Sequence, residues 1–146
     1  MLEINKIKAF LTEVDKSFPV PLSDKQDLNI LAEKFAKHAT VCKIEENGKI
    51  LAMVAGYTEN VTDNMAYISV VASLPCARGK GYATKLVLDF IGIARSKKLS
   101  AIHLYTVSSN IAAVRMYEKI GFTEYLCEDE TRPDDLHLIY HIEKEE

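Results

Sequence analysis

The sequence predicts one mixed α/β (α+β) domain over residues 1–146, with a mixed β-sheet flanked by helices. Three observations carry this expectation. The length of 146 residues suits a single domain, and an apolar share of 48% is enough to build a core. Helical and strand patterns alternate along the chain in the order ααβββαβαββ, without a repeat or linker. A charged share of 27% is ordinary for a globular protein, which excludes disordered, collagen-like and coiled-coil classes.

Two amphipathic helices are expected first. The opening helix has apolar residues at helical spacing, namely Ile4, Ile7, Leu11, Val14 and Phe18. Because proline breaks helices, we expect this helix to end before Pro19. Ser23, followed by Gln26 three positions later, is typical of a capping box and predicts the start of the second helix. The apolar stripe of that helix consists of Leu28, Leu31, Ala32, Phe35 and Ala39.

The pattern then changes to strands. Apolar runs at residues 41–45 and 49–58 flank the tripeptide Glu46-Asn47-Gly48. Asn-Gly between two such runs is the strongest short signal for a β-hairpin. After a polar turn, Met65–Ser73 is rich in β-branched residues and predicts a third strand.

The second half of the chain alternates helices and strands. A helix is expected after a glycine-containing loop, with Leu86, Val87, Phe90, Ile91 and Ala94 on one face. A strand at 100–107 and a helix at 110–119 follow, and Gly121 suits the C-terminal cap of that helix. Two last strands, at 122–127 and 136–142, are joined by an acidic loop.

Several classes of protein are disfavoured by composition. The longest apolar run, residues 50–57, has eight residues, whereas a membrane helix needs about 20. No N-terminal signal peptide is visible, and the three cysteines form no CxxC motif, so we expect reduced thiols in a cytoplasmic protein without a metal site. The net charge of −3 does not suggest a nucleic-acid partner, and a homodimer is left open.

The loop Arg78-Gly79-Lys80-Gly81-Tyr82-Ala83 lies between a predicted strand and a predicted helix. Glycines allow close approach of a ligand to the backbone, and a helix N-terminus offers unpaired N–H groups with a partial positive charge. This combination is suited to phosphate or pyrophosphate, although a purely structural turn is an equal alternative on the loop alone. The loop lacks the Lys-Ser/Thr of a P-loop and the third glycine of a dinucleotide-binding motif.

A second motif downstream makes the pattern specific. Together the two motifs resemble the GNAT superfamily of acyl-CoA-dependent N-acetyltransferases. The pyrophosphate motif of that family is matched by Arg78, Gly81 and Ala83, and its later motif by Asn110, Ala113, Tyr117, Gly121 and Phe122. The resemblance is close over residues 40–125 and extends to the element order of nearly the whole chain.

The resemblance implies acetyl-CoA as cosubstrate and a central sheet that splays in its middle. Main-chain groups of Val71, Ala72 and Ser73, near a bulge at the C-terminal end of their strand, would pair with the pantetheine amides. N–H groups of Arg78, Gly79, Lys80, Gly81, Tyr82, Ala83 and Thr84 would hold the pyrophosphate. Asn110 would bond the pantetheine arm or fix the following helix, and Tyr117 would act as general acid toward the thioester sulfur. The first strand usual in the family should be missing or vestigial, since only residues 2–4 could form it.

The general base is not evident from the sequence. The strand Met65–Ser73 carries no acid, and the position five residues before Asn110 is Tyr105. His103 and His137 lie on predicted strands, where histidines are more often packed or solvated than catalytic. The loop acids Glu128, Asp129, Glu130, Asp134 and Asp135 would either steer a cationic amine or form a solvated hairpin tip.

Three functions are therefore compared. The first is acetyl transfer to a small amine, an amino sugar or a peptide amine by direct attack in a ternary complex. The second is a non-catalytic acyl-CoA-binding module, which the presence of Asn110 and Tyr117 disfavours. The third is a general nucleotide-phosphate binder, which the absent P-loop signature disfavours.

Overall fold

The computed structural model describes residues 2–15, 22–24, 26–127 and 129–142. Its helices and strands follow the order expected from the sequence. The helices are α1 (Leu2–Val14), α2 (Leu28–His38), α3 (Tyr82–Ser96) and α4 (Ile111–Ile120), with short 3₁₀ turns η2 (Leu22–Asp24) and η3 (Pro75–Ala77). The strands are β1 (Thr40–Glu46), β2 (Lys49–Tyr57), β3 (Met65–Ser73), β4 (Ala101–Thr106), β5 (Thr123–Glu124) and β6 (Leu136–His141).

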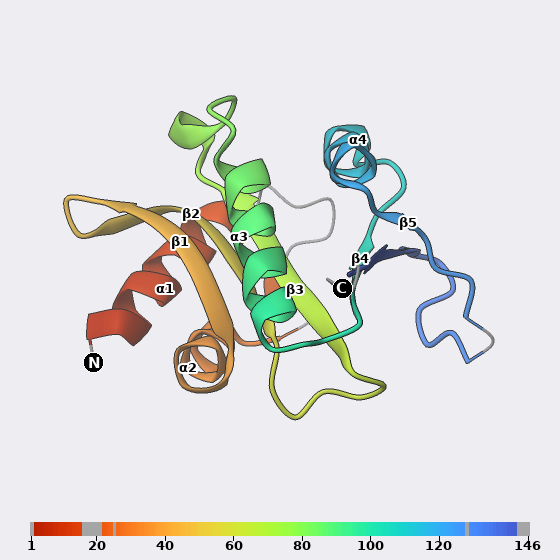
Figure 1. Ribbon diagram of the computed structural model, residues 1–146. Coiled ribbons are helices and arrows are strands. Elements are labelled where there is room, and N and C mark those ends of the chain that lie inside the picture. The colour runs from red at the N-terminus through yellow and green to blue at the C-terminus, as the bar shows by residue number, and fades with distance from the viewer. Residues whose placement is uncertain (1, 16–21, 25, 128, 143–146) are drawn as a thin grey trace.

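The strands form one six-stranded sheet in the order β1-β2-β3-β4-β6-β5. All neighbouring strands are antiparallel except β3 and β4, which are joined through α3 and run parallel. The parallel ladder covers only Met65 to Ile68 of β3 against Ala101 to Leu104 of β4. Beyond these residues the two strands separate, and Figure 1 shows β3 and α3 diverging from β4 and α4. The splayed sheet expected from the family resemblance is therefore present.

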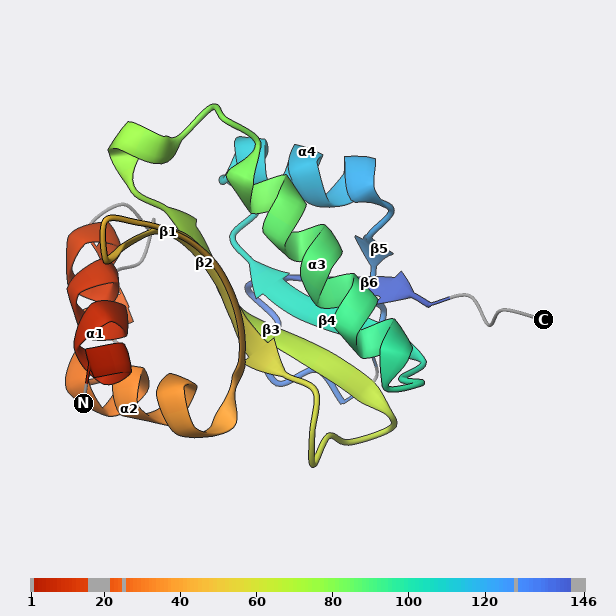
Figure 2. The ribbon, with the colours of Figure 1, turned by 60° about the vertical axis from the view of Figure 1, so that its left-hand side comes forward.

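Helices cover both faces of the sheet and enclose two separate cores. Figure 2 shows α1 and α2 on one side of β1 and β2, and α3 on the other. The first core packs α1 and α2 on the sheet, with Phe10, Leu11, Phe35 and Met53 among its buried side chains. The second core packs α3 and α4 on the opposite face, around Phe90 and its neighbours. Together they bury the apolar stripes that predicted each helix.

The β1–β2 hairpin follows from two residues. Asn47 and Gly48 have φ angles of 53° and 79°, and Glu46 pairs directly with Lys49 across them. Positive φ at both central positions is the signature of a type I′ turn, whose twist matches that of the flanking strands. The Asn-Gly prediction is confirmed, and the turn sets the pairs Glu46–Lys49 and Glu45–Ile50, after which the register shifts between Glu45 and Ile44.

Helix α2 is capped by a different residue from the one expected. Asp27, not Ser23, is its N-cap, and the carboxylate accepts hydrogen bonds from the N–H groups of Asn29 at 2.7 Å and Ile30 at 3.3 Å. Ser23 instead donates its hydroxyl and its backbone N–H to the Asp15 carboxylate, at 2.6 and 2.9 Å. The capping-box prediction was wrong because a contact eight residues away in sequence occupies the serine.

The ends of the chain also differ in part from expectation. Residues 2–4 belong to α1, so the described residues form no strand before β1. Phe18, assigned to the first helix from periodicity, lies outside the described residues. The expected strand over 122–127 is reduced to the two residues of β5, although Tyr125 N–H still donates to the His137 carbonyl at 2.8 Å.

Candidate functional site

A cleft of about 380 Å³ opens where β3 and β4 separate. Its lining includes seven residues singled out from the sequence, namely Val71, Ala72, Ser73, Arg78, Ala83, Asn110 and Tyr117. Four further lining residues were not predicted as site residues, namely Val14, Ala112, Ala113 and Met116. Val14 and Ala72 belong to the α1/α2 core, whereas Val71 and Tyr117 belong to the α3/α4 core. The cleft therefore has walls from both faces of the sheet.

A bulge in β3 accompanies the separation of the strands. Ala55 pairs with Val70 and Gly56 with Ile68, so Ser69 is left opposite no partner residue on β2. In a regular strand Ile68 and Val70 would face the same side of the sheet. Here Ile68 faces the α3/α4 core and Val70 faces the α1/α2 core, so the bulge reverses the side-chain alternation. The expectation that the bulge lies near the C-terminal end of β3 was wrong, because the bulge at Ser69 lies in the middle of the strand. Since β4 pairs only up to Ile68, the main-chain groups of the later β3 residues border the cleft.

The glycine loop leads directly into α3. Gly79 and Gly81 both have φ of 79°, and Gly81 is the N-cap of the helix. A Cβ at either glycine would meet no atom within 4 Å, so it is the backbone conformation, not crowding, that favours glycine here. The helix extends over 15 residues, and its first-turn N–H groups have no partner within the helix. This end of α3 presents a partial positive charge beside the cleft.

The charged residues of the loop have different surroundings. Arg78 lines the cleft and donates from Nε to the carbonyl oxygen of Ser73 at 3.3 Å, which ties the loop to the end of β3. Lys80 lies instead in a second hollow with Lys49 and Cys76. Of the two cationic side chains in the loop, Arg78 therefore lines the cleft and Lys80 does not.

Helix α4 carries the second predicted motif. Asn110 is its N-cap, and Oδ1 accepts from the Ala113 N–H at 3.5 Å. Of the two roles inferred for Asn110, fixing the helix is thus observed. Gly121 is the C-cap, with φ of 127°, as its position predicted.

Tyr117 projects from α4 into the cleft wall and is 6% exposed. Its ring packs edge-on against Phe122, with centroids 5.6 Å apart. Burial raises the pKa of Tyr117 above its ordinary value near 10, so the hydroxyl is protonated at neutral pH. A protonated hydroxyl in a largely apolar wall can donate a proton to a developing anion.

These features fit coenzyme A. The anionic pyrophosphate suits the N-terminus of α3 and Arg78, and the glycine conformations allow the ligand close to the backbone. On the side toward β4, the end of β3 has no partner strand and offers main-chain groups for the pantetheine amides, in the manner of an added strand. Tyr117 and Asn110 line the cleft from α4 and its N-cap, and the Tyr117 hydroxyl would lie near the thioester end of the ligand.

A second group of polar side chains lies on the other face of β4 and β6. Nδ1 of His103 is 2.8 Å from Nε2 of His137, and Nδ1 of His137 is 2.7 Å from Oε2 of Glu130. The Tyr105 hydroxyl donates to Oε1 of Glu130 at 2.6 Å, and the Arg132 guanidinium lies 4.4 Å from the centre of the Tyr105 ring. We call His103, His137, Glu130 and Tyr105 the histidine network.

The network changes the protonation of its members. The hydrogen bond from Tyr105 is the largest cause that lowers the pKa of Glu130 to about 2, so Glu130 is a carboxylate at neutral pH. Burial lowers the pKa of His103, and the neighbouring His137 lowers it further. His103 is therefore neutral near pH 7.

Sequence reasoning named both histidines but not their connection through Glu130. It treated Glu130 as one of a set of loop charges, whereas the structure binds it to Tyr105 and His137, and pairs Asp135 with Arg132 at 2.6 Å. Glu128 lies outside the described residues. Only the two-residue spacing of His103 and Tyr105 hinted that they share a face.

Two further tests concern membranes and metals. No helix formed by the described residues combines the length and apolar character needed to span a bilayer. Among the same residues, no group of three or more His, Cys, Asp and Glu side chains is arranged to hold a metal ion.

Comparison with known proteins agrees with the geometry. The model of the acetyltransferase (GNAT) family matches residues 7–122. A mycothiol acetyltransferase from Thermomonospora curvata is 32% identical over 94 residues, which are 64% of this chain and 31% of the relative. This chain therefore spans about a third of that relative's length.

Solved structures share the fold. An acetyltransferase of the GNAT family from Staphylococcus aureus Mu50 superposes with a TM-score of 0.76 at 16% identity, covering 96% of this chain and 93% of that one. A putative acetyltransferase from Salmonella typhimurium, solved with its cofactor acetyl-CoA, gives a TM-score of 0.72 at 17% identity and covers 99% and 92% of the two chains. With the family model matching most of the sequence and the cleft carrying its two motifs, the chain belongs to the acetyltransferase (GNAT) family.

Proposed function

We propose that this protein transfers an acetyl group from acetyl-CoA to an amine by direct attack in a ternary complex. The observation that carries the proposal is the cleft, in which the end of β3, the start of α3, Asn110 and Tyr117 are brought together. A non-catalytic acyl-CoA-binding module would need the end of β3 and the start of α3 to hold the ligand. It would not need the buried hydroxyl of Tyr117 in the cleft wall.

The binding role falls to the backbone. Val71, Ala72 and Ser73 would offer main-chain groups to the pantetheine arm, and the N–H groups of residues 78–84 would hold the pyrophosphate. Arg78 adds charge at the cleft, and Asn110 holds the first turn of α4 so that Tyr117 keeps its place. Acetyl-CoA supplies an activated acyl group when it is bound.

The chemical role falls to Tyr117. The lone pair of the neutral amine forms a bond to the acetyl carbon, and the bond from that carbon to sulfur breaks with its electron pair on sulfur. Tyr117 donates its hydroxyl proton to that sulfur, the acylated nitrogen loses one N–H proton, and that proton returns through water to the Tyr117 oxygen, which leaves the amide and coenzyme A as neutral products. Because burial raises the pKa of Tyr117, the hydroxyl holds its proton until the thiolate forms.

The class of acceptor follows from the family. The relative from Thermomonospora curvata is named a mycothiol acetyltransferase, and a fold neighbour from Escherichia coli is named a ribosomal-protein-S18-alanine N-acetyltransferase. For this chain we propose a small-molecule or peptide amine, with no nucleic acid, membrane or metal required. A cytoplasmic location is part of the same proposal.

The decisive experiment measures thiol release from acetyl-CoA with a panel of alkylamines, amino sugars and short peptides. We expect release that depends on an amine and matches the acetylated product one to one. Tyr117→Phe keeps the ring packed on Phe122 but removes the proton donor, and it should lower kcat about 10²–10⁴-fold with little change in the KM for acetyl-CoA. Coenzyme A binding without thiol release from any amine would favour the non-catalytic alternative.

A further inference from the structure

The histidine network lies on the face of β4 and β6 opposite the α3/α4 core, next to the point where β3 and β4 separate. Ile102 and Leu104 of β4 face the α3/α4 core, so the alternate residues His103 and Tyr105 face the opposite side. Tyr67 of β3 pairs with His103 and shares this face, with ring centroids 5.0 Å apart. His103 is thus one residue before the last pair of β3 and β4, beyond which the two strands separate.

The hydrogen bonds of the network determine where the protons sit. Glu130 is a carboxylate and can only accept, so Nδ1 of His137 must carry the proton that bonds it. In the tautomer of the His137 ring that carries one proton, on Nδ1, the lone pair is on Nε2, and this nitrogen accepts from Nδ1 of His103. Neutral His103 consequently has its own lone pair on Nε2. That atom makes no hydrogen bond to any of the residues that the structure describes.

The groups around His103 favour a neutral ring that can still take up a proton. Facing it are His137 from β6, Tyr67 from β3, Tyr105 from its own strand and Tyr125 from the segment after β5, with Glu130, Arg132 and Asp135 behind them. Burial and His137 lower the pKa of His103, whereas Glu130 raises it. The ring is therefore unprotonated near pH 7, yet a protonated ring would be stabilised through His137 by the carboxylate.

We propose that His103 is the general base of the reaction, taking a proton from the acceptor ammonium at Nε2, and that His137 and Glu130 are positioning residues that hold its tautomer. This inference rests on the proposed acetyl transfer and supplies the base that the sequence did not reveal. Amine and protein exchange one proton in this step, in which an N–H bond of the ammonium breaks and an N–H bond at Nε2 forms.

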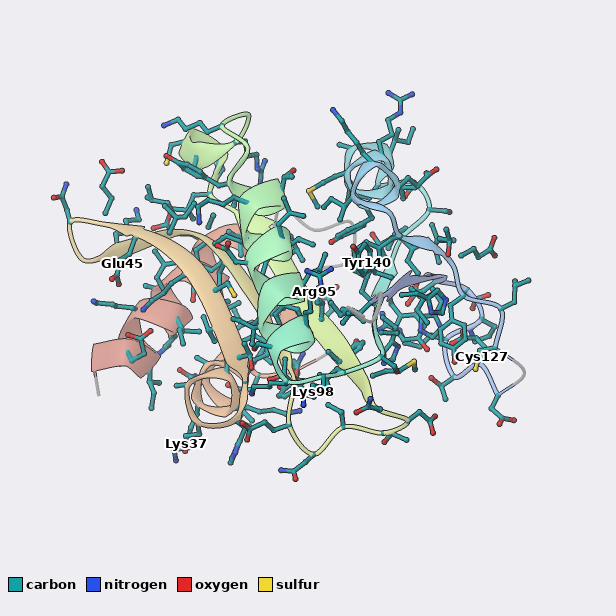
Figure 3. The ribbon with its side chains drawn as sticks, viewed as in Figure 1. Lys37, Glu45, Arg95, Lys98, Cys127 and Tyr140 are labelled. Carbon is teal, nitrogen blue, oxygen red and sulfur yellow. The ribbon has the colours of Figure 1, made fainter. Side chains whose placement is uncertain are left out.

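The network also gives that proton a way out. The Nδ1 proton of His103 can pass to Nε2 of His137, and the Nδ1 proton of His137 can pass to Glu130. The Glu130 side chain is 20% exposed, so the chain of hydrogen bonds runs from His103 toward solvent. Figure 3 places Cys127, in the segment before Glu130, near the edge of the molecule.

The first test is structural and needs no acceptor. Imidazole ¹⁵N chemical shifts of the full-length protein should show neutral His103 protonated on Nδ1, with a pKa below the ordinary 6.5. Glu130→Gln should lower that pKa further, because a raising charge is lost. Neutral His103 protonated on Nε2 would overturn the proposal.

The second test is kinetic and uses the best amine from the thiol-release panel. His103→Gln should lower kcat/KM about 10²–10⁴-fold while coenzyme A affinity by calorimetry stays unchanged. Glu130→Gln should move the acidic limb of the kcat/KM profile to lower pH, which a merely structural role would not do. His141→Gln is the matched control, since His141 is an exposed histidine on β6, the strand of His137, and lies outside the network.

The outcomes separate the two proposals. An active wild-type enzyme whose His103→Gln variant keeps its full kcat/KM would overturn the base assignment and leave the proposed function intact. A wild-type protein that acetylates no amine of the panel would overturn the proposed function, and the base assignment with it.

Discussion

Ile68 and Leu104 are the last pair of residues at which β3 and β4 run side by side. One residue later the Ser69 bulge turns β3 away, and the cleft begins. The parallel ladder therefore ends where a ligand would need unpaired main-chain groups. Substitutions around this opening give predictions that separate binding, chemistry and stability.

Gly81→Glu should abolish coenzyme A binding. The substitution puts a side chain and a negative charge at the N-terminus of α3, where the pyrophosphate would lie. Gly48→Glu is a matched control, because Gly48 has the same φ of 79° and equally open surroundings but lies in the β1–β2 turn. Calorimetry should show lost affinity for the first variant only. Equal affinity in both would remove the loop from the site.

Asn110→Ala should weaken both the fold and the site. Losing this N-cap should cost about 0.5–1 kcal/mol of unfolding free energy, since its hydrogen bond to Ala113 is long. Asp27→Ala removes the N-cap of α2, whose hydrogen bond is shorter, and should lower the unfolding free energy by at least as much, about 1 kcal/mol. Urea unfolding measures both costs, and coenzyme A titration should show a loss of affinity for Asn110→Ala alone. A matching loss in Asp27→Ala would mean that general destabilisation explains the effect.

Gly56→Ala should destabilise the protein by overpacking. An added Cβ would lie 2.3 Å from the Tyr67 carbonyl oxygen and 2.7 Å from the Phe90 ring, so we expect a loss of about 1–3 kcal/mol. Gly92→Ala, on the exposed face of α3 with no atom within 4 Å, should instead stabilise by about 0.5–1 kcal/mol. Thermal and urea unfolding of the two variants should give opposite signs, and a neutral Gly56→Ala would show that β2 and α3 can move apart.

Glu130 should make the free energy of unfolding depend on pH in the acidic range. Its pKa is about 2 in the folded protein and near 4.5 when unfolded, so its contribution is present above about pH 4.5 and is lost as pH falls toward 2. The stability gap between wild type and Glu130→Gln should therefore shrink from about pH 6 to about pH 3. Glu124→Gln on β5 is the control variant. A gap that stays constant would mean that the native hydrogen bonds of Glu130 do not favour its charged form.

Much of the fold is encoded by neighbouring residues. The i, i+3, i+4 apolar spacing predicted α1, α2 and α3, Asn47-Gly48 predicted the hairpin turn through the backbone angles that these residues favour, and the loop from Arg78 to Ala83 predicted the start of a helix. These features depend on interactions over a few residues, which a linear pattern records. The same is true of Asn110 and Tyr117, seven residues apart on one helix.

What only the tertiary structure decided involves partners far apart in the chain. His103 contacts His137, which is 34 residues away in sequence, because the antiparallel register of β4 and β6 puts Tyr105 opposite His137. Glu130 reaches His137 from a loop whose conformation has no periodic pattern in the sequence. Asp15 takes Ser23 away from the cap of α2 in the same way. The sequence motifs therefore predicted many of the residues that line the cleft, whereas the cleft itself, the position of the bulge and the histidine network arose from strand register, which depends on the packing of the whole sheet.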